Sequence, residues 1–172
     1  MAPEQGTADF GKDVPVHRRA ERLSHALYGL IIVTATLVAE QSHVTEVIDA
    51  IGLLLGTALV LLLAHTYSAT MAERALENHS LGSVGRLLVV EDNLPVLLAI
   101  VIPALLFALA GFGAITLATA YTAAIEFSVV ALAGLGIYSG RSASMSWTHS
   151  VVSGAAAGAI GLIVVAVEAF FE

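Results

Sequence analysis

The stretch AITLATAYTAAIEFSVVALAGLGIY, residues 114–138, decides the fold. It contains no Lys, Arg or His, and at about 1.5 Å rise per residue a helix of this length crosses the hydrocarbon core of a bilayer. Glu126 lies at its midpoint. Because a carboxylate at that depth costs about 2.5 kcal/mol or more, we expect Glu126 to face other helices or a wet cavity.

Two patterns surround this carboxylate. Thr122 and Thr119 precede Glu126 by four and seven residues, which on a 3.6-residue period places both hydroxyls on its side of the helix. Another set of residues is small at every fourth position, the spacing that lets a second helix backbone approach closely: Thr116, Ala120, Ala124 and Ser128. One helix is therefore predicted to carry both a polar face and a packing seam.

The composition extends this interpretation to the whole chain. The chain has 172 residues, of which 58% are hydrophobic, and a mean hydropathy of +0.88, values typical of a polytopic membrane protein. Apolar segments run over residues 24–39, 47–69, 94–111, 114–138 and 147–171. We therefore predict an all-α protein: a polar tail over residues 1–22, then a single transmembrane domain of five helices over residues 23–172.

The positive charges predict the orientation. All seven Lys and Arg residues lie in the tail, in residues 70–93 or in residues 139–146. If the five segments alternate in direction, these regions share one side, so the positive-inside rule predicts a multi-pass protein of the cell membrane with its N-terminus cytoplasmic and its C-terminus outside.

The start of the third span has two alternatives. The span begins near Asn93, the start we favour, or near Ser83, which would submerge Glu91 and Asp92.

The same composition argues against several classes of function. The chain has no cysteine, so disulfides and thiolate metal sites are excluded. Its net charge of −7 and lack of a basic stripe argue against nucleic-acid binding. The chain also lacks HExxH, P-loop and GxSxG motifs, so we predict neither an enzyme nor a cofactor.

Polar residues near the cytoplasmic side complete the candidate pathway. His65 lies in the cytoplasmic third of the second span, where it could relay protons, and Tyr67 could extend a hydrogen-bonded chain. Glu91 and Asp92 would line the same approach. The alternative for His65 and Tyr67 is an ordinary interfacial pair.

Two further motifs have structural interpretations beside functional ones. Glu40, His43 and Glu46 repeat every three residues and could collect a divalent cation, but a single copy favours a solvated turn, and we predict no metal site. Small residues at helical spacing in the fifth span predict a close-packing face, either within the protomer or between protomers: Gly154, Gly158 and Gly161.

Five short motifs are spread over residues 22–172: Tyr28-Gly29, Ala64-His65-x-Tyr67, Glu91 to Pro95, Gly140-Arg141 and Gly161-Leu162-x-Val164-Val165. Together they resemble a family of small, uncharacterised integral membrane proteins found in actinobacteria, which implies a compact helical membrane protein and no established activity. Arg22-Leu23, Gly29 and Thr36-Leu37 are also similar to the first helix of bacterial homologues of the lysosomal potassium channel. That family has Phe-Ser-Asp-Gly where this chain has Ala26-Leu27-Tyr28-Gly29.

These observations support two hypotheses of function. The first is an oligomeric channel or transporter for protons or small cations that uses Glu126 as its central site. The second is a non-transporting accessory or scaffold protein, in which the acid and the neighbouring hydroxyls only fix helix packing. In either case we expect the protein to be embedded in a lipid bilayer and to associate with further copies of the same chain.

Overall fold

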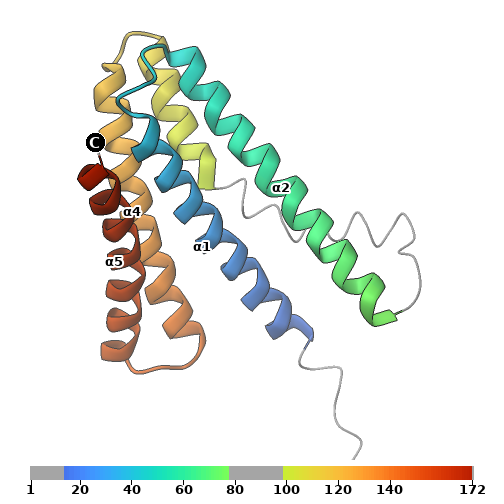
Figure 1. Cartoon of the computed structure of the whole chain (residues 1–172). Coiled ribbons are helices and arrows are strands. Elements are labelled where there is room, and N and C mark those ends of the chain that lie inside the picture. The colour runs from blue at the N-terminus through green and yellow to red at the C-terminus, as the bar shows by residue number, and fades with distance from the viewer. Residues whose placement is uncertain (1–13, 78–98, 172) are drawn as a thin grey trace, which may run out of the picture.

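The computed structural model describes residues 14–77 and 99–171, and these residues form helices and no strand (Figure 1). The predicted all-α class is therefore confirmed. The long helices are α1 (Val14–Glu40), α2 (Val47–Glu77), α4 (Leu117–Ser142) and α5 (Trp147–Phe171). A shorter apolar helix, Ala99–Gly111, precedes α4.

Four of the described helices are long and apolar enough to cross a membrane. The candidate spans are Arg22–Glu40, Val47–Ala72, Leu117–Ser142 and Trp147–Val167. The predicted third span begins at residue 94, and residues 78–98 lie outside the described part of the chain. A fifth span therefore remains a prediction, of which the Ala99–Gly111 helix is the described portion.

Local hydrogen bonds set where the helices begin and end. Thr116 caps α4, because its Oγ1 accepts a hydrogen bond of 3.2 Å from the Thr119 backbone N–H. The helix consequently begins at Leu117 rather than at residue 114. Gly113 has a φ of +76°, a conformation that glycine adopts without steric cost, and so it allows the tight turn before this cap.

The core forms where α4 packs against α1 and the Ala99–Gly111 helix. Ala120, Ala124 and Ser128 are fully buried and form a seam inside the bundle, whereas Thr116, the first residue of the predicted seam, is exposed at the start of α4. The Phe107 ring is also fully buried and contacts the Tyr121 ring edge-on, with the ring centroids 4.7 Å apart. The same cluster of buried residues also includes Leu54 and Ala58 of α2.

Two buried hydroxyls in the core are satisfied within their own helices. Thr34 Oγ1 donates to the Leu30 carbonyl oxygen at 2.7 Å, and Ser128 Oγ donates to the Ala124 carbonyl oxygen at 2.8 Å. Such bonds to the preceding turn leave no polar group exposed to hydrocarbon. These hydroxyls therefore need no partner on another helix.

The most extensive contact between helices is that of α4 with α5, and glycines make it close. A Cβ atom added to Gly136 would lie 2.8 Å from the Gly154 Cα atom, and one added to Gly158 would lie 3.2 Å from the Ala133 Cβ atom. Gly161 lies in the same contact, where an added Cβ would be 3.0 Å from a leucine methyl group. The glycines that the sequence singled out in the fifth span thus lie against α4 of the same chain.

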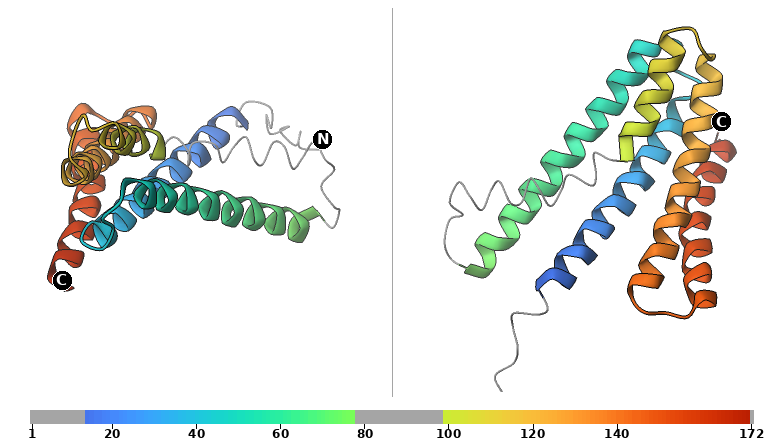
Figure 2. Two further views of the ribbon diagram at one scale, coloured as in Figure 1. Left: turned by 90° about the horizontal axis from the view of Figure 1, so that it is seen from above. Right: turned by 180° about the vertical axis from the view of Figure 1, so that it is seen from behind.

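The connections gather at two ends of the bundle. The α1–α2 connection and the turn before α4 lie at one end, whereas the start of α1 and the α4–α5 turn lie at the other (Figure 1). Figure 2 shows that α2 diverges from α4 and α5 towards its C-terminal end. The described residues therefore leave a large apolar flank of α2 exposed, including Leu55, Leu59 and Leu63.

Candidate functional site

Glu126 lies on the exposed side of α4, opposite the buried seam. Within the described part of the chain, no hydrogen bond or ion pair joins its carboxylate to another residue. Sequence analysis expected this acid to face other helices or a wet cavity, and no described helix covers it. The mid-helix carboxylate is therefore a polar group for which this chain's described residues supply no partner.

Thr119 and Thr122 are exposed on the same side of α4 as Glu126. The Thr122 hydroxyl donates to the Ala118 carbonyl oxygen at 3.1 Å, and the Thr119 and Thr116 hydroxyl oxygens lie 2.8 Å apart. A hydroxyl that donates its proton still has lone pairs available as acceptors. These threonines therefore present oxygen atoms beside the carboxylate, suited to a water, a proton carrier or a small cation.

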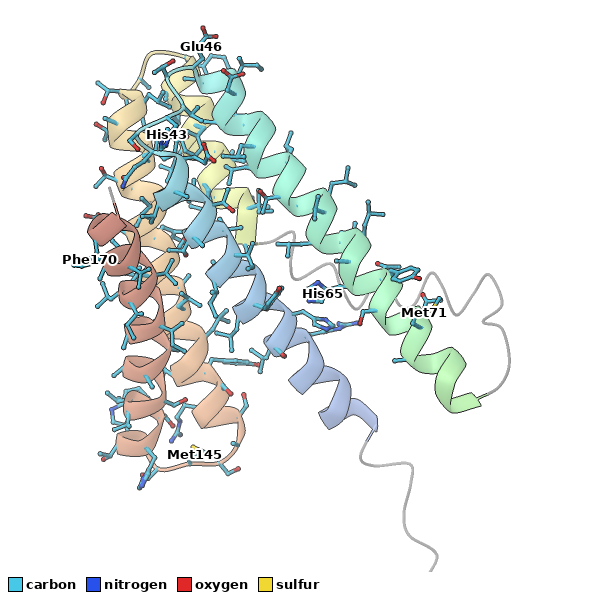
Figure 3. All side chains as sticks on the ribbon, in the orientation of Figure 1. His43, Glu46, His65, Met71, Met145 and Phe170 are labelled. Atoms are coloured by element: carbon cyan, nitrogen blue, oxygen red, sulfur yellow. The ribbon has the colours of Figure 1, made fainter. Side chains whose placement is uncertain are left out.

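A second polar cluster joins α1 to α2. The His65 ring meets the His25 and Tyr28 rings edge-on, at centroid distances of 5.0 Å and 5.1 Å, and Figure 3 shows His65 pointing from α2 towards α1. His65 Nδ1 donates to the Leu61 carbonyl oxygen at 2.9 Å, because a carbonyl can only accept. This bond leaves Nε2 as the acceptor of the neutral ring.

Sequence analysis missed His25, and it named Tyr28 only as part of a motif that resembles a family. The spacing of three residues between them places both rings on one face of α1, and that signal could have paired them. Which residue of α2 would meet this face depends on how the two helices rotate against each other. The structure pairs it with His65.

The remaining residues of the predicted cytoplasmic approach are not brought to His65. The Tyr67 side chain is 66% exposed and does not join the ring cluster. Glu91 and Asp92 lie outside the described residues. His65 faces α1 whereas Glu126 faces away from the bundle, so the described chain contains two separate polar positions rather than one continuous path.

The connection after α1 does not assemble a metal site. His43 is exposed, and its Nδ1 donates to the Ala39 carbonyl oxygen at 3.2 Å. Across the residues that the structure describes, no three or more His, Cys, Asp or Glu side chains converge in a way that could hold a metal ion. His43 and Glu46 are exposed in the connection after α1, whereas Glu40 is the half-buried last residue of α1 itself.

Two buried hydroxyls without a hydrogen-bond partner among the described residues were not anticipated from the sequence, those of Thr66 and Tyr121. The Tyr121 hydroxyl has no hydrogen-bond partner among the described residues, although the side chain is only 3% exposed. An unpaired buried hydroxyl costs about 1–3 kcal/mol.

The ring cluster makes a measurable contribution to stability. Replacing His65 with alanine removes two edge-on ring contacts between α1 and α2, and we expect a loss of about 1 kcal/mol in the free energy of unfolding. Replacing the exposed Tyr67 with alanine should change it by less than about 0.5 kcal/mol. Denaturant unfolding in detergent micelles measures both, and an equal or larger effect at Tyr67 would contradict the observed pairing.

Taken together, the described residues define an all-helical protein with apolar helices compatible with a membrane. Comparison with protein-family models, with curated proteins and with solved structures finds no match. The assignment of function therefore depends on the chemistry and placement of the polar side chains.

Proposed function

We propose that this chain is an oligomeric integral membrane protein that moves protons or small cations, with Glu126 as its central site. The observation that carries this proposal is the exposed carboxylate without a described partner inside the apolar helix α4, nine residues after the start of that helix. Acids inside membrane helices are costly and commonly mark ion or proton pathways. The hydroxyl oxygens of Thr119 and Thr122, on the same face, provide further polar contacts for the transported species.

His65, Tyr67, Glu91 and Asp92 are proposed to line the cytoplasmic side of the protein, where His65 is a polar position separate from Glu126 among the described residues. The meeting of His65 with His25 and Tyr28 supports a polar position at this level, since imidazole and phenol groups both donate and accept hydrogen bonds. The sequence position of Tyr67, Glu91 and Asp92 places them on the same side of the predicted bundle.

The orientation proposed for the protein is five spans in the cell membrane, with the N-terminus cytoplasmic and the C-terminus outside. Arg22 near the start of α1 and Arg141 in the last turn of α4 lie towards the same end of the bundle (Figure 1). The opposite end holds the connections 41–46 and 112–116, which contain no Lys or Arg. The positive-inside rule supports placing the end with the arginines in the cytoplasm.

Flux from reconstituted protein tests the proposed function. Purified protein in liposomes, under an imposed potential, should move protons, K⁺, Na⁺ or a divalent cation faster than protein-free liposomes do. A pH-sensitive dye reports protons, and separate gradients identify the other ions. Silence from folded, correctly oriented protein would contradict transport and favour the accessory or scaffold hypothesis.

A further inference from the structure

The exposed sides of the described helices differ in chemistry. On α2 the exposed side chains include Leu55, Leu59 and Leu63, and on α5 they include Val152 and Ile163. Lipid chains cover such large apolar side chains without cost, because the bilayer interior is as apolar as leucine. Neither surface needs a protein partner.

The exposed side of α4 is different, and we call it the Glu126 face. It consists mostly of small or polar residues: Ala118, Thr119, Thr122, Glu126, Val130, Gly134 and Tyr138. Lipid cannot satisfy a carboxylate, which costs about 2.5 kcal/mol or more at mid-depth. Of the three surfaces compared, this one gains most from a polar protein partner.

We propose that the Glu126 face is a contact between two copies of this chain, in which the carboxyl groups of Glu126 and of the partner subunit's Glu126 meet and share one proton. The inference rests on the proposed function, because it names the partner that completes the Glu126 site. A parallel pair related by a two-fold axis normal to the membrane places identical residues at the same depth. Each Glu126 carboxyl group then lies opposite the carboxyl group of the partner subunit's Glu126.

The shape of the face fits this close approach. A Cβ atom added to Gly134, two helical turns beyond Glu126, would meet no heavy atom within 4 Å. A helix backbone can therefore come close at Gly134 itself, between the larger side chains of Val130 and Tyr138. The Glu126 face also lies opposite the seam of Ala120, Ala124 and Ser128, so pairing would leave the packing inside each protomer unchanged.

Two adjacent carboxyl groups form a stable pair when they share one proton. Two carboxylates at short range repel, but one protonated and one ionised group form a strong O–H···O⁻ hydrogen bond. The shared proton can pass from an oxygen of one carboxyl group to an oxygen of the other, and no carbon–oxygen bond is broken. Such a pair would satisfy both mid-membrane acids and provide a site at which protons enter and leave.

Because the chain has no cysteine, single introduced cysteines can test this contact without background crosslinking through native cysteines. Thr122→Cys and Val130→Cys lie on the Glu126 face, and Leu59→Cys on α2 and Ile163→Cys on α5 serve as matched controls. A disulfide forms only when the Cα atoms approach within about 7 Å. After oxidation of full-length protein in lipid vesicles, we expect dimers at both α4 positions and background levels at both controls.

The carboxyl pair is tested on the Val130→Cys background. Glu126→Gln should keep the crosslink, because two amides also hydrogen-bond, whereas Glu126→Leu, which inserts readily in a membrane, should reduce it to the level of the controls. Crosslinks at the controls alone, no crosslinks at any position, or full crosslinking of Glu126→Leu would each overturn the inference. Flux without α4 crosslinks would overturn this contact alone, and α4 crosslinks without flux would overturn the proposed function alone.

Discussion

Replacing Glu126 with glutamine should abolish ion flux in liposomes while leaving the helical fold intact. The amide has the same shape as the carboxyl group and can hydrogen-bond, but it neither takes up and releases a proton at neutral pH nor neutralises a cation. The fold should not change, because the Glu126 side chain makes no contact that the described structure depends on. We expect flux to fall to the level of protein-free liposomes.

A matched control for this experiment is Asp49→Asn. Asp49 is also an exposed acid, but it lies in the first turn of α2, where an acid is favourable at the N-terminal end of the helix dipole. This variant should retain wild-type flux under the same gradients. Full flux from Glu126→Gln would show that the mid-helix carboxylate is not the transport site, and equal losses from both variants would indicate a general effect of acidic charge.

Replacing Gly136 with leucine should prevent α4 from packing on α5 and abolish recovery of folded protein. Even an alanine Cβ at this position would lie 2.8 Å from the Gly154 Cα atom and 2.8 Å from the Ser153 carbonyl oxygen. Both atoms belong to the backbone of α5, so the clash is relieved only if the two helices separate. We therefore expect Gly136→Ala to lower the free energy of unfolding by about 1–3 kcal/mol, the usual cost of overpacking.

The matched control is Gly56→Ala in α2, where an added Cβ meets no heavy atom within 4 Å. This change should be neutral or stabilise the helix by up to about 1 kcal/mol, since alanine favours helix more than glycine does. Unfolding of each variant in detergent, followed by circular dichroism, measures the difference. Equal stability of Gly136→Ala and Gly56→Ala would contradict the α4–α5 contact described above.

Part of the candidate site could be predicted because it depends on one helix alone. The 3.6-residue period places Thr119, Thr122 and Glu126 on one side of α4, and the structure exposes all three there. The same period cannot say what covers that side. The expectation that Glu126 faces another helix is not met within the described chain, since coverage depends on neighbours that no local pattern specifies.

Pairings between helices were harder to predict. His65 and Tyr67 are two residues apart and therefore point about 200° apart around α2, so at most one of them could join α1. The sequence offered no way to choose between them, and it did not connect His25 with either. The relative rotation and divergence of α1 and α2 brought His25 and Tyr28 to His65 and left Tyr67 exposed.

The sequence by itself determined the all-helical class and the presence of several long apolar helices, because hydropathy and periodicity are properties of neighbouring residues. Only the tertiary structure decided that the glycines of α5 pack against α4, that His65 meets α1, and that Glu126 faces outward. Each of these depends on how one helix is rotated about its axis relative to another. That rotation is set by the packing of side chains that are distant in sequence.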